Sequence, residues 1–177
     1  IVQAPVFASD GTLQTAPGYH EASRTYHAPA KGFILPEIAD NPSAKDITRA
    51  RSLIVDDLLG DFPFVTNSEG AHAVALMLHP FTRDLIDGPT PLHLFEAPSA
   101  GTGKGLLVNV LTCPATGQPA SVMTEGRDDD EWRKQITAEL RKGPSLIIID
   151  NVDSELGSAS LDRALTIDPY HVPAVLM

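Results

Sequence analysis

Hydrophobic and polar positions alternate with helical spacing over the first clearly patterned part of the chain, residues 43–60. Four apolar side chains there fall on one helical face: Ile47, Ala50, Ile54 and Leu58. Ser43, followed three residues later by Asp46, resembles a capping box and predicts where the helix begins. Gly60 is placed to end it. The pattern therefore predicts one amphipathic helix.

A second helical pattern begins at Asn67 or Ser68 and runs through EGAHAVALMLH. Pro80 either interrupts this helix or begins the next turn, because proline lacks the amide that a helix interior needs. Residues 1–42 differ from both helical segments, since they are rich in proline, glycine and small polar residues. Turn signals at Asp10-Gly11 and Pro17-Gly18 predict short strands or an extended arm there.

Strand and helix patterns alternate from residue 92 onward. The run LHLFEA (92–97) predicts a strand, a glycine-rich loop follows, and GLLVNVLT predicts a helix. ASVMTE predicts a second strand, DDDEWRKQITAELRK a helix that Gly143-Pro144 ends, and SLIIID a strand buried on both faces. This order indicates an α/β fold with a mainly parallel sheet flanked by helices. We expect three parts: an extended or β-rich arm (1–42), a helical subdomain (43–91) and a nucleotide-binding core (92–177).

Composition and charge narrow the class of protein. Of 177 residues, 42% are hydrophobic and 20% charged, as is typical of a globular chain, and no apolar run reaches the roughly 18 residues that span a bilayer. The net charge is −10, from 13 Lys and Arg against 23 Asp and Glu, and no basic stripe is visible. If the chain acts on DNA, we therefore expect these residues to form the motor and not the main DNA-binding surface.

Features at single positions add three expectations. The lone cysteine, Cys113, excludes an intrachain disulfide, which suits a cytoplasmic protein, and we expect it and Trp132 in the core. The six histidines show no metal-ligand spacing, so no metal site beyond Mg²⁺ is expected. The chain starts with Ile1 and stops after Met177 without a terminal signature, so we treat it as a fragment truncated at the C-terminus.

The loop PSAGTGKG (98–105) carries the main chemical signal. It lies between a predicted strand and a predicted helix, where backbone amides and the helix start form an anion pocket. Aligned with the phosphate-loop pattern G-x-x-x-x-G-K-[ST], it keeps the glycines and the lysine of the centre GTGK. The expected phosphate-binding residues are Ser99, Ala100, Gly101, Thr102, Gly103, Lys104 and Gly105. The alternative is a tight loop that packs for structural reasons alone.

Two departures from the pattern bear on hydrolysis rather than on binding. Pro98 replaces the first glycine and lacks an N–H, but the amides of residues 101–105 should contribute most to phosphate binding. Gly105 replaces the serine or threonine whose hydroxyl holds Mg²⁺. Thr102, Ser99 or a water molecule are the candidate substitutes, and hydrolysis could slow while binding survives.

An acidic residue at the end of the last predicted strand completes the pattern. Asp150 follows the apolar run LIII and is expected to contact Mg²⁺ through water, the alternative being a strand-end cap. Its neighbour Asn151 can orient a water molecule but is a poor base. Glu125, at the preceding strand end, is the best candidate to activate water, although a solvated loop carboxylate is the more common role; Asp153 and Glu155 are weaker candidates.

APSAGTGKGLL together with DDDEWRKQITAELRKGPSLIIIDNV resembles the ATPase module of primase–helicase-like replication proteins from bacteria, phages and mobile elements. The resemblance covers residues 5–165 and is specific around 92–112 and 128–152. It implies a P-loop motor, a ring-forming homo-oligomer, that couples ATP hydrolysis with Mg²⁺ to movement along single-stranded or forked DNA. Lys104 and Asp150 carry over as the phosphate lysine and the metal-associated acid. The polar sensor strand and the arginine finger would follow Met177, and Arg163 is better explained as a surface arginine.

The sequence thus favours an ATP-hydrolysing DNA helicase or translocase component. A nucleotide-binding regulatory or assembly module with weak or no hydrolysis is the alternative, motivated by Gly105 and Asn151. A small-molecule kinase is a third alternative, less favoured because no arginine-rich lid is visible.

Overall fold

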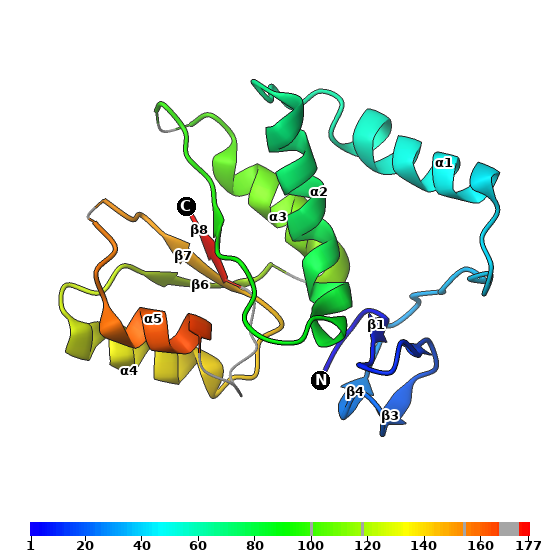
Figure 1. Ribbon diagram of the computed structural model, residues 1–177, viewed down its shortest axis with the longest axis horizontal. Coiled ribbons are helices and arrows are strands. Elements are labelled where there is room, and N and C mark those ends of the chain that lie inside the picture. Colours follow the sequence, from blue (N-terminus) through cyan, green and yellow to red (C-terminus); the bar gives the residue numbers. More distant parts are fainter. Residues whose placement is uncertain (100, 118, 154, 167–173) are drawn as a thin grey trace.

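A four-stranded, all-parallel sheet with helices on both faces forms the centre of the protein (Figure 1). The computed structural model describes residues 1–99, 101–117, 119–153, 155–166 and 174–177. The strand order is β5-β8-β7-β6, with β5 His93–Leu94, β6 Ser121–Thr124, β7 Ile147–Asp150 and β8 Ala174–Leu176. The expected α/β class with a parallel sheet between helices is confirmed.

The helices cover the sheet as two layers. The bounds are α2 Asn67–Thr82, α3 Lys104–Thr116, α4 Asp129–Leu140 and α5 Ala159–Thr166. Ile148 of β7 and Val175 of β8 pack in one hydrophobic core with α2 and α3. Ile147 and Ile149 point to the other face and pack with α4 and α5. Burial of both faces explains why β7 is a continuous apolar run, and each such side chain contributes about 1.5–3 kcal/mol.

Helix α4 forms as its sequence predicts. Asp128 is the N-cap, and its carboxylate accepts a hydrogen bond from the amide of Glu131 at 2.8 Å. Trp132 and Ile136 are buried against the sheet, as expected for Trp132. The polypeptide leaves the helix through Gly143, whose φ of 63° lies in the left-handed region.

The structure corrects the predicted course of two helices at their prolines and the predicted burial of Cys113. Helix α2 continues through Pro80 to Thr82 and then tightens into a 3₁₀ turn, η2 (Arg83–Leu85). Helix α3 extends beyond the predicted GLLVNVLT, includes Pro114 and ends before Gly117, whose φ is 69°. Cys113 lies on the outer side of α3 and is exposed, so its expected place in the core is wrong.

The first predicted helix forms, but most of its apolar face is not buried. Ser43 and Asp46 make the predicted capping box, with Ser43 N donating to Asp46 Oδ2 at 3.0 Å. Helix α1 (Ala44–Ser52) continues as a π-helical segment, η1 (Leu53–Leu58), in which Leu59 N donates to Ile54 O. Three predicted face residues are exposed, and only Ile54 packs on the core: the exposed ones are Ile47, Ala50 and Leu58. The reason is that α1 extends away from the sheet and its flanking helices (Figure 1).

The N-terminal arm forms the short strands that its turn signals predict. Two antiparallel hairpins pair β1 Val6–Phe7 with β2 Leu13–Gln14, and β3 Gly18–His20 with β4 Thr25–His27. At the first turn, Asp10 Oδ1 accepts hydrogen bonds from the amide and hydroxyl of Thr12 at 2.9 and 2.6 Å. Strand β1 contacts α2 and η2, so the arm packs beside the helical layer. In the described ranges, no helix has the length and apolar character needed to cross a bilayer.

Two histidine rings meet between α2 and β5. His79 Nδ1 and His93 Nε2 lie 3.1 Å apart, so one ring donates a hydrogen bond and the other accepts it. Burial, the neighbouring His93 and the positive charge of Arg83 lower the pKa of His79 from 6.5 to about 4. Burial, together with His72, also lowers the pKa of His93. The pair is therefore neutral near pH 7 and holds α2 beside the strand that leads into the glycine-rich loop.

We predict that stability falls as the pH is lowered from about 6.5 to about 4. In this range the unfolded chain binds a proton at His79 that the folded chain does not, so the free energy of unfolding decreases by up to about 1.4 kcal/mol per pH unit. Urea unfolding at pH 7 and pH 5 measures the decrease, and His79→Gln should remove much of it. His20→Gln, in β3 of the N-terminal arm, is the control. An equal pH dependence in His79→Gln and the wild type would contradict this assignment.

Candidate functional site

Glycines shape the loop between β5 and α3. Gly101 and Gly103 have φ values of 82° and 89°, in the left-handed region where side chains are strained. A Cβ atom placed at Gly101, Gly103 or Gly105 would meet no atom within 4 Å. Gly101 and Gly103 are thus required by backbone conformation, and none of the three glycines is required by close packing. The loop is open around these positions, which disfavours a turn packed only for structural reasons. Ala100, a predicted phosphate-binding residue, lies outside the described residues.

The start of α3 differs from the start of every other described α-helix. Gly103 is its N-cap and supplies no side chain, the first turn contains no acidic residue, and the first helical bond runs from Leu107 N to Gly103 O. The other four helices begin with a side-chain oxygen that accepts a backbone amide: Ser43, Thr66, Asp128 and Ser158. Among the described residues, the first amides of α3 therefore have no side-chain acceptor, and uncapped helix amides of this kind can bind an anion.

Lys104 is the first residue of α3 and is half-buried beside the loop. In the part of the chain that the structure describes, ion pairs join Arg133 to Asp130 and Lys142 to Glu139, and none involves Lys104. Ser99 and Thr102 are exposed, so their hydroxyls are accessible beside the loop. Gly105 is exposed as well, and its surroundings would admit a side chain.

Asp150 ends β7 at the same edge of the sheet as the loop. Because all four strands are parallel, the carboxyl ends of β5 and β7 lie at one edge, with β8 between them. Two inter-strand steps separate β5 from β7 by about 10 Å. Asp150 is half-buried, and its Oδ1 accepts a hydrogen bond from the amide of Asn151 at 2.8 Å. The structure thus brings the predicted phosphate loop and the predicted metal-associated acid to one edge.

Asn151 reverses the chain direction directly after Asp150. Its φ is 56°, a left-handed conformation that asparagine tolerates better than most residues. Its amide donates a hydrogen bond to the Asp150 carboxylate, and its side chain is exposed. In the described chain Asp150 Oδ2 accepts no hydrogen bond, so that oxygen can meet a water molecule or a hydrated cation.

Glu125 lies next to Asp150 but is engaged with the chain that follows it. Thr124 of β6 pairs with Asp150 of β7, so the two strand ends are adjacent, as the sequence suggested. Glu125 Oε2 accepts a hydrogen bond from the amide of Asp153 at 3.0 Å. Strand β6 lies at the far side of the sheet from β5, and Glu125 follows the strand most distant from the phosphate loop. This contact supports a structural use of the carboxylate more directly than the activation of water.

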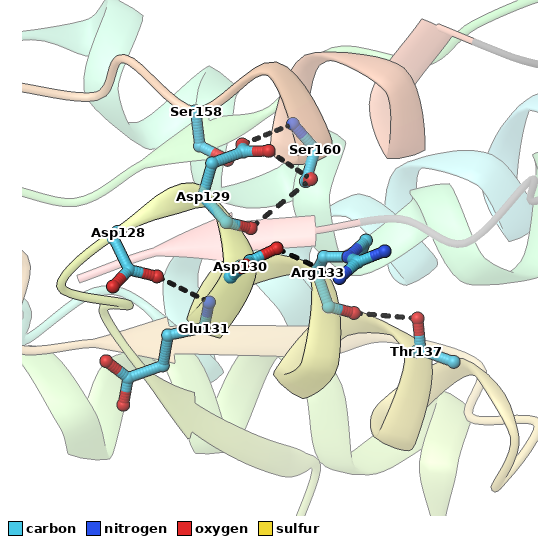
Figure 2. A network of polar contacts seen from close by, with 8 residues as sticks. All are labelled: Asp128, Asp129, Asp130, Glu131, Arg133, Thr137, Ser158 and Ser160. Carbon is cyan, nitrogen blue, oxygen red and sulfur yellow. Dashed lines mark hydrogen bonds and ion pairs between the residues drawn. The ribbon is translucent and has the colours of Figure 1, made fainter.

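Sequence reasoning missed the separate contacts of three consecutive aspartates (Figure 2). Asp128 caps its own helix α4, and Asp130 pairs with Arg133 at 2.9 Å. Asp129 instead reaches the start of α5, where its carboxylate binds Ser158 and Ser160. The hydroxyl-rich run SAS, just ahead of the LDRAL helical pattern, was the available signal for a capped helix start, but it did not identify the partner.

Strand β8 was also missed, because AVL is short and carries no periodicity. It lies between β5 and β7, and the pairing continues past it, with Met177 N donating to Ile149 O at 2.9 Å and Val152 N to Met177 O at 3.2 Å. The predicted sensor and arginine finger were placed after Met177 and stay predictions. Arg163 lies on α5 and is exposed, consistent with a surface arginine.

The site supplies few protein side chains to a metal ion, so it fits a metal that is held mainly by water and by the phosphates of a bound molecule. No group of three or more His, Cys, Asp or Glu side chains able to hold a metal ion occurs among the described residues. Mg²⁺ keeps several waters and is commonly bound through one or two carboxylates plus phosphate oxygens. A single carboxylate with one uncommitted oxygen, such as Asp150, fits that donor set.

Comparisons of the chain with protein-family models, curated proteins and solved structures found no match. The resemblance to primase–helicase-like ATPase modules therefore stays an expectation from the motifs. What supports a function is the geometry of the loop, of the first turn of α3 and of Asp150.

Proposed function

We propose that this chain binds and hydrolyses a nucleoside triphosphate, ATP with Mg²⁺. The observation that carries the proposal is the start of α3. It has no side-chain cap, it follows a loop whose glycines are left-handed, and it lies at the same sheet edge as Asp150. Amides that point at the open loop and a helix start favour phosphate groups.

Some residues of the site have a proposed role in phosphate binding, and others have a proposed role in catalysis. The loop from Ser99 to Gly105 surrounds the phosphates with amides, and the Lys104 ammonium adds charge-assisted hydrogen bonds to the β and γ groups. Asp150 would hold Mg²⁺ through water. Bound Mg²⁺ neutralises charge on the phosphates. The Asn151 amide side chain is exposed beside this acid and orients the attacking water.

The finer assignment is a DNA-dependent motor: a helicase or translocase component of replication, homo-oligomeric and cytoplasmic. Its support is the resemblance of the loop and of the Asp150 region to primase–helicase-like modules, together with their order along the chain. The net charge of −10 argues against a broad nucleic-acid grip on these residues, so we place the main DNA contact in an oligomer or in another part of the protein.

A second candidate function is a nucleotide-binding regulatory module with slow or no hydrolysis. Gly105 favours it, because the usual Mg²⁺ hydroxyl is missing and the position is open. Asn151 favours it too, since it stands where many such ATPases have glutamate.

Lys104→Ala tests the phosphate site. Loss of hydrogen bonds from a charged group costs about 1.5–3 kcal/mol, so the dissociation constant for ATP should rise roughly 10- to 150-fold. Isothermal titration calorimetry or a fluorescent ATP analogue measures it. Lys134→Ala, an exposed lysine on α4, is the control and should bind like the wild type. Equal affinities for Lys104→Ala and Lys134→Ala would refute the site.

Gly105→Ser separates the two candidate functions. A serine fits without close contacts and restores a hydroxyl for Mg²⁺, so under the motor proposal it lowers the Mg²⁺ requirement while turnover rises less than about tenfold, or about 1.4 kcal/mol. Steady-state phosphate release over a Mg²⁺ titration measures both quantities. Negligible wild-type turnover with strong activation by serine would instead support the regulatory module.

Single-stranded DNA should stimulate ATP hydrolysis in the complete protein that contains this chain. We expect the rate of hydrolysis to rise about fivefold or more, which is the lower end of typical coupling between two sites. The stimulation should decline as salt is added, because contacts with the DNA phosphates weaken. Lys104→Ala should show no stimulated turnover. Constant turnover across single-stranded, duplex and forked DNA would count against a motor.

A further inference from the structure

Acidic residues between the end of β6 and the start of α4 bind the chain that follows Asp150. Two segments leave the carboxyl edge of the sheet side by side: residues 125–128 lead from β6 to α4, and residues 151–158 lead from β7 to α5. Residue 154 lies outside the described part. The hydrogen bonds between these segments come from Glu125 and Asp129.

Asp129 holds the end of the second connection. Its Oδ1 accepts hydrogen bonds from Ser158 Oγ at 2.8 Å and Ser160 N at 2.9 Å, and its Oδ2 accepts one from Ser160 Oγ at 2.9 Å (Figure 2). Ser158 is buried, and its Oγ also accepts the amide of Leu161 at 3.1 Å. These bonds lower the pKa of Asp129, so the carboxylate is ionised at neutral pH. Asp129 therefore helps to cap α5 from another helix.

Glu125 holds the beginning of the same connection. Its Oε2 accepts the amide of Asp153, three residues after Asp150. The backbone of Asp150 itself is held by pairing with Thr124 in β6. The sheet thus fixes the strand end, and Glu125 and Asp129 fix the direction in which the chain leaves it.

That direction bears on the Asp150 side chain through Asn151. The peptide group between Asp150 and Asn151 directs its N–H at Asp150 Oδ1, and Asn151 has a left-handed φ of 56°. Such a conformation persists only when the surrounding structure holds it. If the following segment were released, this peptide group could rotate about the Cα–C bond of Asp150, and the hydrogen bond that orients the carboxylate would be lost.

We infer that Glu125 and Asp129 are positioning residues, which hold Asp153, Ser158 and Ser160 so that the Asn151 amide orients the Asp150 carboxylate toward the metal-bound phosphates. The inference rests on the proposed function, because it assigns the means by which that same site is aligned. It also gives Glu125 a role different from activation of water.

The matched pair Asp129→Asn and Asp130→Asn tests the inference. The two substitutions remove the same charge from adjacent residues of one helix, but only Asp129 contacts α5. In Asp129→Asn we expect turnover to fall about 10- to 100-fold, as for a misplacement of about 1 Å, with the KM for ATP unchanged. The Mg²⁺ concentration for half-maximal turnover should rise. Asp130→Asn should match the wild type in all three.

Two measurements do not depend on turnover. The first is amide hydrogen exchange, which should speed up at Asp153 and Ser160 in Asp129→Asn and not in Asp130→Asn. The second is the gain in affinity for a non-hydrolysable ATP analogue on adding Mg²⁺, which should shrink in Asp129→Asn while Mg²⁺-free affinity stays constant. Circular dichroism confirms that the variants are folded. A purely structural role would lower stability and leave the Mg²⁺ dependence of the folded protein unchanged.

Glu125 separates positioning from base catalysis. Glu125→Gln keeps an oxygen that can accept the Asp153 amide, so it should retain much more turnover than Glu125→Ala. A general base would lose activity equally in both variants, and that result would overturn the role given to Glu125. Equal behaviour of Asp129→Asn and Asp130→Asn, with ATP still bound normally, would overturn the role of Asp129 alone. Failure of the wild type to bind ATP would overturn the proposed function and this inference with it.

Discussion

Parallel pairing of β5, β8 and β7 is the constraint on which the candidate site depends. It brings the carboxyl ends of all the strands to one edge, so the strand that leads into the glycine-rich loop lies about 10 Å from the strand that ends at Asp150, although 46 positions (150 − 104) separate Lys104 from Asp150. Parallel strands require crossover helices, and these bury both faces of the sheet. The apolar run at 146–149 is therefore both the core of the fold and the support of Asp150.

The same topology places the starts of three helices, α3, α4 and α5, at this edge. These helix starts differ in whether side chains cap their first amides. Acidic and hydroxyl side chains bind the first amides of α4 and α5 through Asp128, Ser158 and Asp129. Each carboxylate there compensates the positive end of a helix dipole. Only α3 keeps its first amides without a side-chain cap and has no acid in its first turn. Two helix starts thus stabilise the fold, and one remains suited to an external anion.

Local signals in the sequence predicted what local interactions determine. The capping box at Ser43 and Asp46, the α4 helix and the strand ending at Asp150 all depend on residues within a few positions of one another. The loop glycines marked the turn between β5 and α3, because φ above zero favours glycine whatever surrounds it. The exposed face of α1 was not predicted, since periodicity shows that a face is apolar but not whether another element covers it.

Contacts between distant segments carried no such signal. Strand β8 pairs through its backbone with β5 and β7, and three apolar residues can do this in almost any sequence. The Asp129 contacts with Ser158 and Ser160 join two helix starts that are neighbours only because β6 and β7 are paired. The role of Glu125 depends on the same pairing: adjacency of the strand ends follows from chain order, but the partner of its carboxylate does not.

The acidity of the protein is compatible with a phosphate site because the relevant field is local. Mobile ions screen exposed charges beyond a Debye length of about 8–10 Å, so most of the net charge of −10 acts weakly at the α3 start. Three acids at the sheet edge are committed: Asp128 and Asp129 bind helix amides, and Glu125 binds the chain after β7. A carboxylate engaged in this way compensates positive dipoles and repels a bound triphosphate less than a free carboxylate does.

A DNA backbone differs, because it carries charge along its whole length and would meet the remaining acids over a wide surface. The electrostatics of this chain therefore favour a compact anion that fits one helix start, and under the proposed motor function DNA would need a binding surface of opposite charge.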